Sequence, residues 1–363
     1  MKASVLAALA AAVLFGASTP FAKALVGAVS PVLLAGLLYL GSGIGLSLVR
    51  LARDRGLKTS GLSRSEWPWL AGAIVAGGVL GPVLLMYGLT RTSAADASLL
   101  LNLEAVLTAL LAWIGFRENA DRRIVLGMAL IVAGGVVLAW PAGGAAPTSL
   151  AGALAVAGAC ACWAVDNNLT RKVSANDPLF IAGAKGLVAG ITNVGLPLAF
   201  GSRPPPLALT TAAMSVGFAG YGVSLVLFVL ALRGLGSART GAYFSTAPFV
   251  GAAIAIAAFG EPVSWPFWLA AALMAAGVWL HFTEVHEHEH AHEAITHAHA
   301  HRHDDHHRHQ HSFDWDGREP HTHEHRHEPL VHRHPHYPDV HHRHGHQGSG
   351  ASPRANRKSS ARR

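Results

Sequence analysis

The chain has 363 residues, of which 51% are hydrophobic and only 13% charged, and its formal net charge is +7. Residues 1 to about 282 are almost entirely apolar, which excludes an ordinary soluble domain and favours a membrane protein with several spans. The positive charge is divided between loops and tail, so it does not indicate a nucleic-acid surface.

Ten apolar stretches approach or exceed the length of about 20 residues that a helix needs to cross a bilayer. The first could imitate a signal peptide, but its apolar run continues past a plausible cleavage point, and we interpret it as a span. The predicted spans are residues 3–25, 31–50, 67–89, 94–116, 122–140, 149–171, 178–200, 210–232, 237–259 and 264–282.

Lysine and arginine gather in every second loop, and such loops stay on the cytoplasmic side of a membrane. The intervening loops, such as 27–30 and 261–264, are nearly free of basic residues. We therefore expect both termini in the cytoplasm. The basic loops contain Arg53, Arg55, Lys58 and Arg64; Arg117, Arg122 and Arg123; Arg171 and Lys172; and Arg233 and Arg239.

The stretch Leu89–Glu118 recurs 143 positions later as Leu232–Glu261, with a Phe and a Glu at matching helix ends. Each copy belongs to a unit of five spans, and an odd number of spans turns the second unit upside down in the membrane. Inverted repeats are typical of secondary transporters, whose substrate site lies near the midplane. The predicted fold is an all-α integral membrane protein with repeats at 1–140 and 141–282 and a tail at 283–363.

Several segments resemble the EamA-like drug/metabolite transporter superfamily over about residues 1–282. They are Phe15–Lys23 (FGASTPFAK), Cys162–Lys172, Asn102–Gly134 and Pro248–Gly277. The resemblance implies a ten-helix carrier of the bacterial inner membrane, often an exporter of small metabolites. The chain departs from that family's pattern at Glu104, and at Arg117-Glu118 where Gly-Glu is usual.

Glu104 is the most prominent ionisable residue inside a predicted span, next to Asn102 and ten residues from the start of the span. Its counterpart in the second repeat is Ala247, so it breaks the internal symmetry. Charged residues within spans are costly and tend to be functional. Glu104 could couple transport to protons or another cation, or balance a cationic substrate. Alternatively, it is a neutral, hydrogen-bonded residue that joins helices.

Lys185 and Asp166 lie at similar predicted depth and could pair as part of an inner gate. Alternatively, Lys185 extends to the interface and Asp166 is ordinary polarity near a loop. Lys23 is a further transport candidate, although it lies close enough to the end of its span to reach the interface. Asn193 is more consistent with a helix-joining hydrogen bond.

Aromatic and hydroxyl side chains are candidates for the lining of a central cavity, since such cavities use aromatics and a few polar groups. Each of them could instead serve helix packing. Cys160 and Cys162 are two apart on a helix and point to different faces, so we do not expect a shared metal site. The cavity candidates are Tyr87, Trp163, Tyr221, Tyr243, Ser245 and Thr246.

The tail contains 23 of the 24 histidines and lacks apolar periodicity, so we expect it to be disordered. Imidazoles alternating with Asp and Glu suit Zn, Ni or Co. The tail could also sense pH, because histidine titrates near ~6.5, or store metal. The predicted ligands are His286, His288, His290, His297, His299, His301, His303, His306, His307, His309, His311, His321, His323, His325, His327, His341, His342, His344 and His346.

The leading hypothesis is a secondary carrier that exports a small metabolite by alternating access, coupled to protons, with a metal-binding tail as sensor or buffer. One alternative is a divalent metal exporter, and another is a membrane-anchored metal-storage protein. No nucleophile–base arrangement indicates an enzyme, and no cofactor is required beyond metal in the tail. The expected partners are a small molecule, lipid and divalent ions, in a monomer or homodimer.

Overall fold

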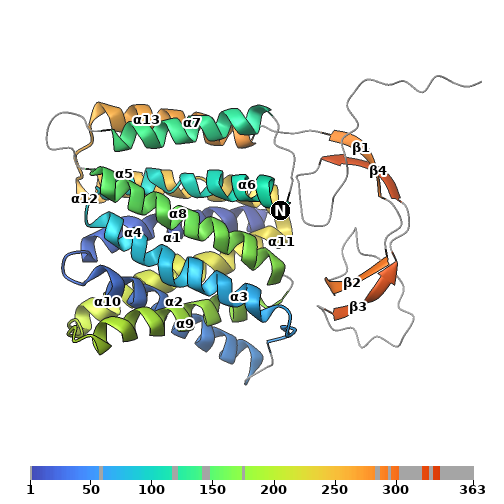
Figure 1. Ribbon diagram of the computed structural model, residues 1–363, viewed down its shortest axis with the longest axis horizontal. Coiled ribbons are helices and arrows are strands. Elements are labelled where there is room, and N and C mark those ends of the chain that lie inside the picture. The colour runs from blue at the N-terminus through green and yellow to red at the C-terminus, as the bar shows by residue number, and fades with distance from the viewer. Residues whose placement is uncertain are drawn as a thin grey trace, which may run out of the picture.

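The structure is a computed structural model (Figure 1) that describes residues 2–56, 60–116, 122–140, 148–173 and 176–282, with side chains left aside at a few helix positions. Beyond residue 282 it describes only the backbone of four short strands. The described part up to residue 282 is all-helical apart from one isolated bridge between Val26 and Val29, in agreement with the predicted fold class.

The first half supplies five apolar segments whose positions match the predicted spans. The third is one continuous helix with a π-helical stretch, η1, in its middle. The fourth is broken at Leu101–Asn102. The elements are α1 (Lys2–Leu25), α2 (Pro31–Asp54), α3 (Trp67–Ala73), η1 (Ile74–Leu80), α4 (Gly81–Leu89), α5 (Ala94–Leu100), α6 (Leu103–Phe116) and α7 (Arg122–Ala139).

The second half repeats these features, including a π-helical stretch in its third segment and a break at Ser245–Thr246. Both lie 143 or 144 positions after their counterparts, so the repeat seen in the sequence extends to irregular backbone. The elements are α8 (Leu150–Thr170), η2 (Arg171–Val173), α9 (Pro178–Ala199), α10 (Leu207–Gly217), η3 (Phe218–Val223), α11 (Ser224–Phe244), α12 (Ala247–Phe259) and α13 (Trp265–Phe282).

One predicted boundary is wrong. Spans at 210–232 and 237–259 were expected to be separated by a loop, but α11 continues to Phe244. In the first half, the hydroxyl of Ser93 accepts a hydrogen bond from the Asp96 amide and so starts α5. The equivalent position is Gly236, which offers no side-chain cap, and no proline interrupts the helix there. In the described part, eight stretches are long and apolar enough to cross a membrane, and Ala247–Phe259 and Trp265–Leu280 are shorter apolar helices.

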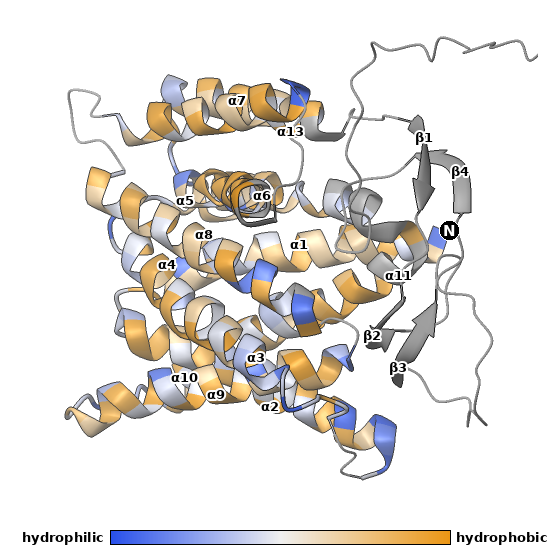
Figure 2. Cartoon of the chain, turned by 45° about the vertical axis from the view of Figure 1, so that its right-hand side comes forward, coloured by the Kyte–Doolittle hydropathy of each residue, from blue (hydrophilic) through white to orange (hydrophobic). Residues whose placement is uncertain are grey.

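The helices pair as two related halves would require. α2 packs against α9, α7 against α13, and α5 against α12. α1 packs on α11 and α12, and α8 packs on α4 and α6, which is the same relation with the halves exchanged. In Figures 1 and 2 the α7–α13 pair forms an outer layer.

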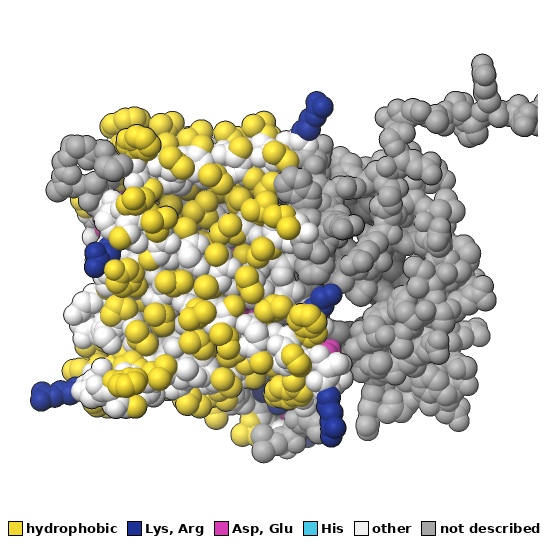
Figure 3. Space-filling model, in the orientation of Figure 1, with side chains coloured by type: hydrophobic (Ala, Val, Ile, Leu, Met, Phe, Trp, Pro, Cys, Tyr) yellow, Lys and Arg dark blue, Asp and Glu magenta, His cyan; other side chains and the backbone are white. Residues whose placement is uncertain are grey.

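Small residues let the central helices approach closely, as is common between membrane helices. At the α2–α9 crossing, a Cβ on Gly43 or Gly186 would overlap the backbone of the partner helix. Most residues along the helices are hydrophobic (Figure 2). The face of the bundle seen in Figure 3 is largely apolar, with Lys and Arg at its two ends. Trp265 and Trp268, at a predicted span end, are 74% and 60% exposed, which suits an interfacial belt.

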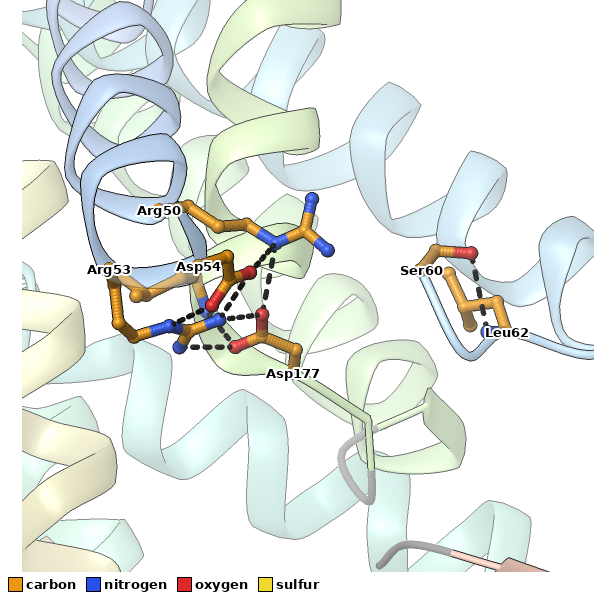
Figure 4. A network of polar contacts seen from close by, with 7 residues as sticks. Arg50, Arg53, Asp54, Ser60, Leu62 and Asp177 are labelled. Carbon is orange, nitrogen blue, oxygen red and sulfur yellow. Dashed lines mark hydrogen bonds and ion pairs between the residues drawn. The ribbon is translucent and has the colours of Figure 1, made fainter. Parts of the chain in front are cut away.

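An ion-pair cluster joins α2 to the start of α9 at one end of the bundle (Figure 4). Asp177, the N-cap of α9, accepts from Arg53 Nη2 at 2.6 Å and from Arg50 Nε at 3.0 Å. Arg53 also contacts Asp54 through Nε at 2.7 Å. Arg53 belongs to a basic loop of the sequence, so the cluster marks an end of the bundle that carries such a loop.

The tail differs from the expectation of no regular structure. Four antiparallel strands are described, paired β1 with β4 and β2 with β3. The alternation of His with other residues has the period of two that an extended strand repeats. The strands are β1 (Glu287–His292), β2 (Thr296–His301), β3 (His321–Arg326) and β4 (Leu330–Pro335).

Candidate functional site

Polar side chains from three helices meet inside the bundle. α8 supplies two neighbouring residues, Asp166 and Asn167. Successive residues on a helix point about 100° apart, so the two reach different partners. Asp166 faces α9 and Lys185, whereas Asn167 faces α6 and Glu104. α8 therefore connects the two groups that the sequence marked as candidate transport residues.

Asp166 and Lys185 form the ion pair that their predicted depth suggested. The ammonium Nζ lies 2.6 Å and 2.7 Å from the two carboxylate oxygens, and the side chains are 8% and 11% exposed. The Thr170 hydroxyl donates to Asp166 at 2.8 Å and accepts from Lys185 at 3.3 Å. Lys185 thus points at a partner rather than toward the interface, and the pair carries no net charge where a single charge would be costly.

Glu104 accepts a hydrogen bond of 2.8 Å from the Asn167 amide, which also lies 3.5 Å from the Thr108 hydroxyl. Asn167 is exposed. The outer face of α8 is marked by Val165, 39% exposed, and Asn167 lies about 200° around the helix from it. Asn167 is therefore exposed on a different side of α8 from Val165, and its partner Glu104 is half-buried, in contrast to the buried Asp166–Lys185 pair.

The π-helical stretch η1 supplies backbone acceptors beside this cluster. The Gly77 carbonyl accepts from the Tyr39 hydroxyl at 2.8 Å and from Trp163 Nε1 at 3.0 Å. The Asn193 amide lies 3.2 Å from the Val79 carbonyl, so it joins α9 to η1 as expected. A π-helical turn shifts the hydrogen-bond register and is frequent at functional sites. It frees these carbonyls for side chains of neighbouring helices.

Gly77 also sets the distance between η1 and α8. A Cβ at this position would overlap the carboxylate of Asp166. Only glycine allows the Asp166–Lys185 pair to sit directly against the helix, so Gly77 is as much part of the site as the charged residues.

The predicted cavity residues divide into two groups. Trp163 lies in the cluster through its bond to Gly77, and Tyr221 packs against Tyr39 with ring centres 5.4 Å apart. Tyr87 is 40% exposed, and its ring lies 5.0 Å from the Arg91 guanidinium, so the structure does not bring it to the cluster. The other three, Tyr243, Ser245 and Thr246, lie at the break before α12. There the Ser245 hydroxyl donates to the Gly241 carbonyl and the Thr246 hydroxyl donates to the Tyr243 carbonyl.

Asn102 and Lys23 also lie apart from the cluster. Asn102 is buried, and its amide bonds the Leu99 carbonyl at 2.9 Å and approaches Met274 Sδ, which supports the break between α5 and α6. Lys23 extends to the far end of α4, where it bonds two backbone carbonyls. The transport roles predicted for both residues stay predictions.

The sequence does not single out three residues of this cluster: Tyr39, Gly77 and Asn167. Asn167 is adjacent to Asp166, but that position alone does not predict its contact with Glu104. Tyr39 is the one tyrosine of α2, a signal that was available. Gly77 acts through its carbonyl and its missing side chain, which a side-chain pattern does not reveal.

The described side chains contain no group of three or more His, Cys, Asp or Glu residues able to hold a metal ion. Cys160 is buried and Cys162 half-buried, and neither forms a disulfide. The tail histidines lie outside the residues whose side chains the structure describes. Metal binding by the tail therefore stays a prediction.

Similar proteins point to one class. An uncharacterized transporter of Methanothermobacter thermautotrophicus is 27% identical over 285 residues, covering 74% of this chain and 83% of the relative. A probable 4-amino-4-deoxy-L-arabinose-phosphoundecaprenol flippase subunit ArnE of Pseudomonas aeruginosa is 44% identical over 75 residues, which cover 21% of this chain and 63% of that protein. A solved crystal structure matches with a TM-score of 0.58 and 24% identity over 76% of this chain and 94% of its own, and shares the fold.

A family description extends this likeness over both halves. The description of the EamA-like transporter family matches residues 2–140 and again residues 150–283, so each five-helix unit is one copy of the family's repeat. Together the matches cover most of the chain. The protein belongs to the EamA-like transporter family.

Proposed function

We propose that this protein is a secondary carrier that moves a small molecule across the bacterial inner membrane by alternating access, with both termini in the cytoplasm. The observation that carries the proposal is the hydrogen bond between Glu104 of α6 and the exposed Asn167 of α8, next to the buried Asp166–Lys185 ion pair. Basic residues at alternate loops support the orientation. The broken fourth and ninth segments support a carrier, because discontinuous helices are typical of transporter sites.

Glu104 is the group we assign to substrate or proton binding. Lys185 is engaged by Asp166, whereas Glu104 has an amide partner and no ion pair among the described residues. A carboxylate with a neutral partner can take a proton or a cationic group in turn, which is the exchange that coupling requires. A protonated amine would suit it, and the similar ArnE proteins carry an amino sugar in their name. Export to the outside is the direction we propose.

The test uses purified full-length protein in liposomes with a pH-sensitive dye inside. A panel of amines, amino sugars and amino acids is added outside, and substrates are those that change the internal pH. Glu104→Gln keeps the hydrogen-bonding shape but removes the titratable charge. Loss of a hydrogen bond to a charged group costs about 1.5–3 kcal/mol, so we expect at least a roughly tenfold loss of substrate affinity and loss of the pH change.

The matched control is Glu66→Gln, because Glu66 precedes α3 outside the spans and bonds Ser63 and Asn176. It should transport like the unmodified protein. If Glu104→Gln and Glu66→Gln both retain full substrate-driven proton movement, Glu104 is not the coupling group.

Metal-ion export is a weaker candidate, because the described side chains offer no metal-binding group. The tail composition instead supports a metal sensor or buffer attached to a carrier of another substrate. We include Zn, Ni and Co in the panel so that the same assay tests this alternative.

A further inference from the structure

At the end of the bundle opposite the Arg53–Asp177 cluster, Lys23 joins α1 to the end of α4. Its ammonium donates to the Leu89 carbonyl at 2.5 Å and to the Thr92 carbonyl at 2.7 Å. Leu89 is the last residue of α4, and the final carbonyls of a helix lack partners within the helix and carry partial negative charge. A lysine that could have reached solvent is instead committed to this helix end.

Glu261 makes the complementary contact from the second half of the chain. Its two carboxylate oxygens accept hydrogen bonds from the Ala94 amide at 2.9 Å and the Ala95 amide at 2.8 Å. These amides open α5, where helix N–H groups are free and the dipole favours an anion. Charge-assisted bonds of this kind are stronger than neutral ones.

A glycine turn aims Glu261 at that helix. Gly260 ends α12 with φ of 65°, in the left-handed region that favours glycine, and the Glu261 amide bonds back to the Ala255 carbonyl at 3.2 Å. Gly260 and Glu261, which end the second copy of the repeat, therefore form a turn that presents a carboxylate.

The Lys23 and Glu261 contacts lie on either side of the same connection, the turn of residues 90–93 between α4 and α5. Lys23 holds the helix end before the turn, and Glu261 holds the helix start after it. α5 then leads through the break at Leu101–Asn102 into α6, which carries Glu104. The turn held by Lys23 and Glu261 is thus separated from Glu104, the proposed binding residue, by one short helix.

We propose that Lys23 and Glu261 form an outer latch, which keeps this end of the carrier closed in the state described here and releases when the carrier turns. The proposal rests on the alternating-access carrier proposed above. Reachable Asn167 near the opposite end of α8 and buried Ser98 near the latch fit a state closed on one side only.

The test weakens the latch without adding bulk, using Lys23→Met or Glu261→Gln in the full-length protein. The closed-side reporter is Ser98→Cys, because Ser98 is 1% exposed, lies one turn into α5, and faces Gly251 of α12. The open-side reporter is Asn167→Cys. Each is reacted with a membrane-impermeant thiol reagent from its own side of the membrane, and the labelling of Cys160 and Cys162 in the parent is subtracted.

We expect either latch variant to speed labelling at residue 98 by roughly tenfold or more, the scale of one lost bond to a charged group, and to slow labelling at residue 167. Opposite changes at the two reporters distinguish a shift between states from general loosening. Lys2→Met, at the other end of α1, and Glu66→Gln are the matched controls and should leave both rates unchanged.

Each other outcome is decisive. Faster labelling at residue 98 with no change at residue 167 supports the latch but counts against alternating access. Faster labelling at both reporters, or at neither, overturns the latch. If Lys23→Met does not fold, Glu261→Gln carries the test alone, because Glu261 holds the turn through hydrogen bonds to other backbone groups than Lys23 does.

Discussion

At the residue scale, charges in this protein are used in pairs or against helix ends. Asp166 with Lys185, and Asp177 with two arginines, are paired side chains from different helices. Lys23 and Glu261 instead neutralise backbone groups. Within the candidate site, Asp166 has the cationic partner Lys185, whereas the hydrogen-bond partner that the described residues give Glu104 is the neutral Asn167, and this difference singles Glu104 out.

Asp177 gives a pH-dependent prediction at this scale. Burial alone would raise the pKa of Asp177, but hydrogen bonds from Arg53 and Arg50 hold it below its ordinary value. A lowered folded pKa means that the ionised carboxylate stabilises the protein above the unfolded value of about 3.9, and that this stabilisation is lost as the pH falls through the folded pKa. Asp177→Asn should therefore lower the melting temperature at pH 7.

The measurement is a pH series of thermal unfolding in detergent for the unmodified protein and Asp177→Asn. The difference between them should stay constant down to about pH 4 and shrink below it. Arg53→Gln removes one partner and should reduce the same difference. An equal difference at pH 7 and well below the folded pKa would show that the carboxylate charge is not what joins α2 to α9.

At the element scale, irregular backbone positions the site. The π-helical stretch η1 frees the Gly77 carbonyl for Tyr39 and Trp163, and the break between α5 and α6 starts a new helix one residue before Glu104. Both features have counterparts in the second half at nearly the same offset. The irregularities are therefore properties of the repeat rather than local accidents.

Gly77→Ala tests this role. The added methyl group overlaps the Asp166 carboxylate, so the ion pair with Lys185 must shift. Overpacking of this kind typically costs about 1–3 kcal/mol. We expect a lower melting temperature together with loss of transport in the liposome assay. The matched control is Gly195→Ala in α9, where a Cβ meets nothing within 4 Å. Full transport by Gly77→Ala would show that the site tolerates a different spacing.

How much the sequence could predict also depends on the element. Hydropathy located the third span at residues 67–89, where the structure has it, because span length is set by the bilayer. The similar depth predicted for Asp166 and Lys185 in the membrane suggested that they pair, as they do in the structure. Predicted depth did not find Asn167 as the partner of Glu104, because that contact depends on how α6 and α8 are rotated. The loop predicted after residue 232 does not form, because Gly236 stands where Ser93 caps the equivalent helix of the first half and cannot start a new helix in the same way.

At the scale of the whole molecule, two structurally related halves make one bundle, and the helices of one half pack mainly against those of the other. The two halves differ in their charged residues, because the position of Glu104 in the first repeat is occupied by Ala247 in the second.

The metal binding predicted for the tail can be tested separately from transport by the bundle. In a full-length variant with the tail histidines replaced by serine, we expect loss of Zn²⁺ and Ni²⁺ binding, measured by calorimetry, and unchanged transport of an organic substrate. Only neutral imidazole binds metal, so binding by the unmodified protein should weaken as the pH falls through about 6.5. Adding EDTA should reverse it.

If metal ions still raise the melting temperature of the serine variant, the bundle itself binds metal. A ligand at a hundred times its Kd stabilises the folded state by about 2.7 kcal/mol, which a thermal-shift measurement detects. That result would favour metal export over the export of an organic molecule.

The bond between Glu261 and the start of α5 has a consequence for how the protein is made. The two partners are 166 and 167 residues apart in the chain, so α5 is synthesised long before its carboxylate. Since synthesis runs from the amino terminus, the Ala94 and Ala95 amides of α5 lack their carboxylate partner until Glu261 has been synthesised. A product that stops short of residue 261 would lack both bonds, so it would differ from the finished protein far along the chain from its point of truncation.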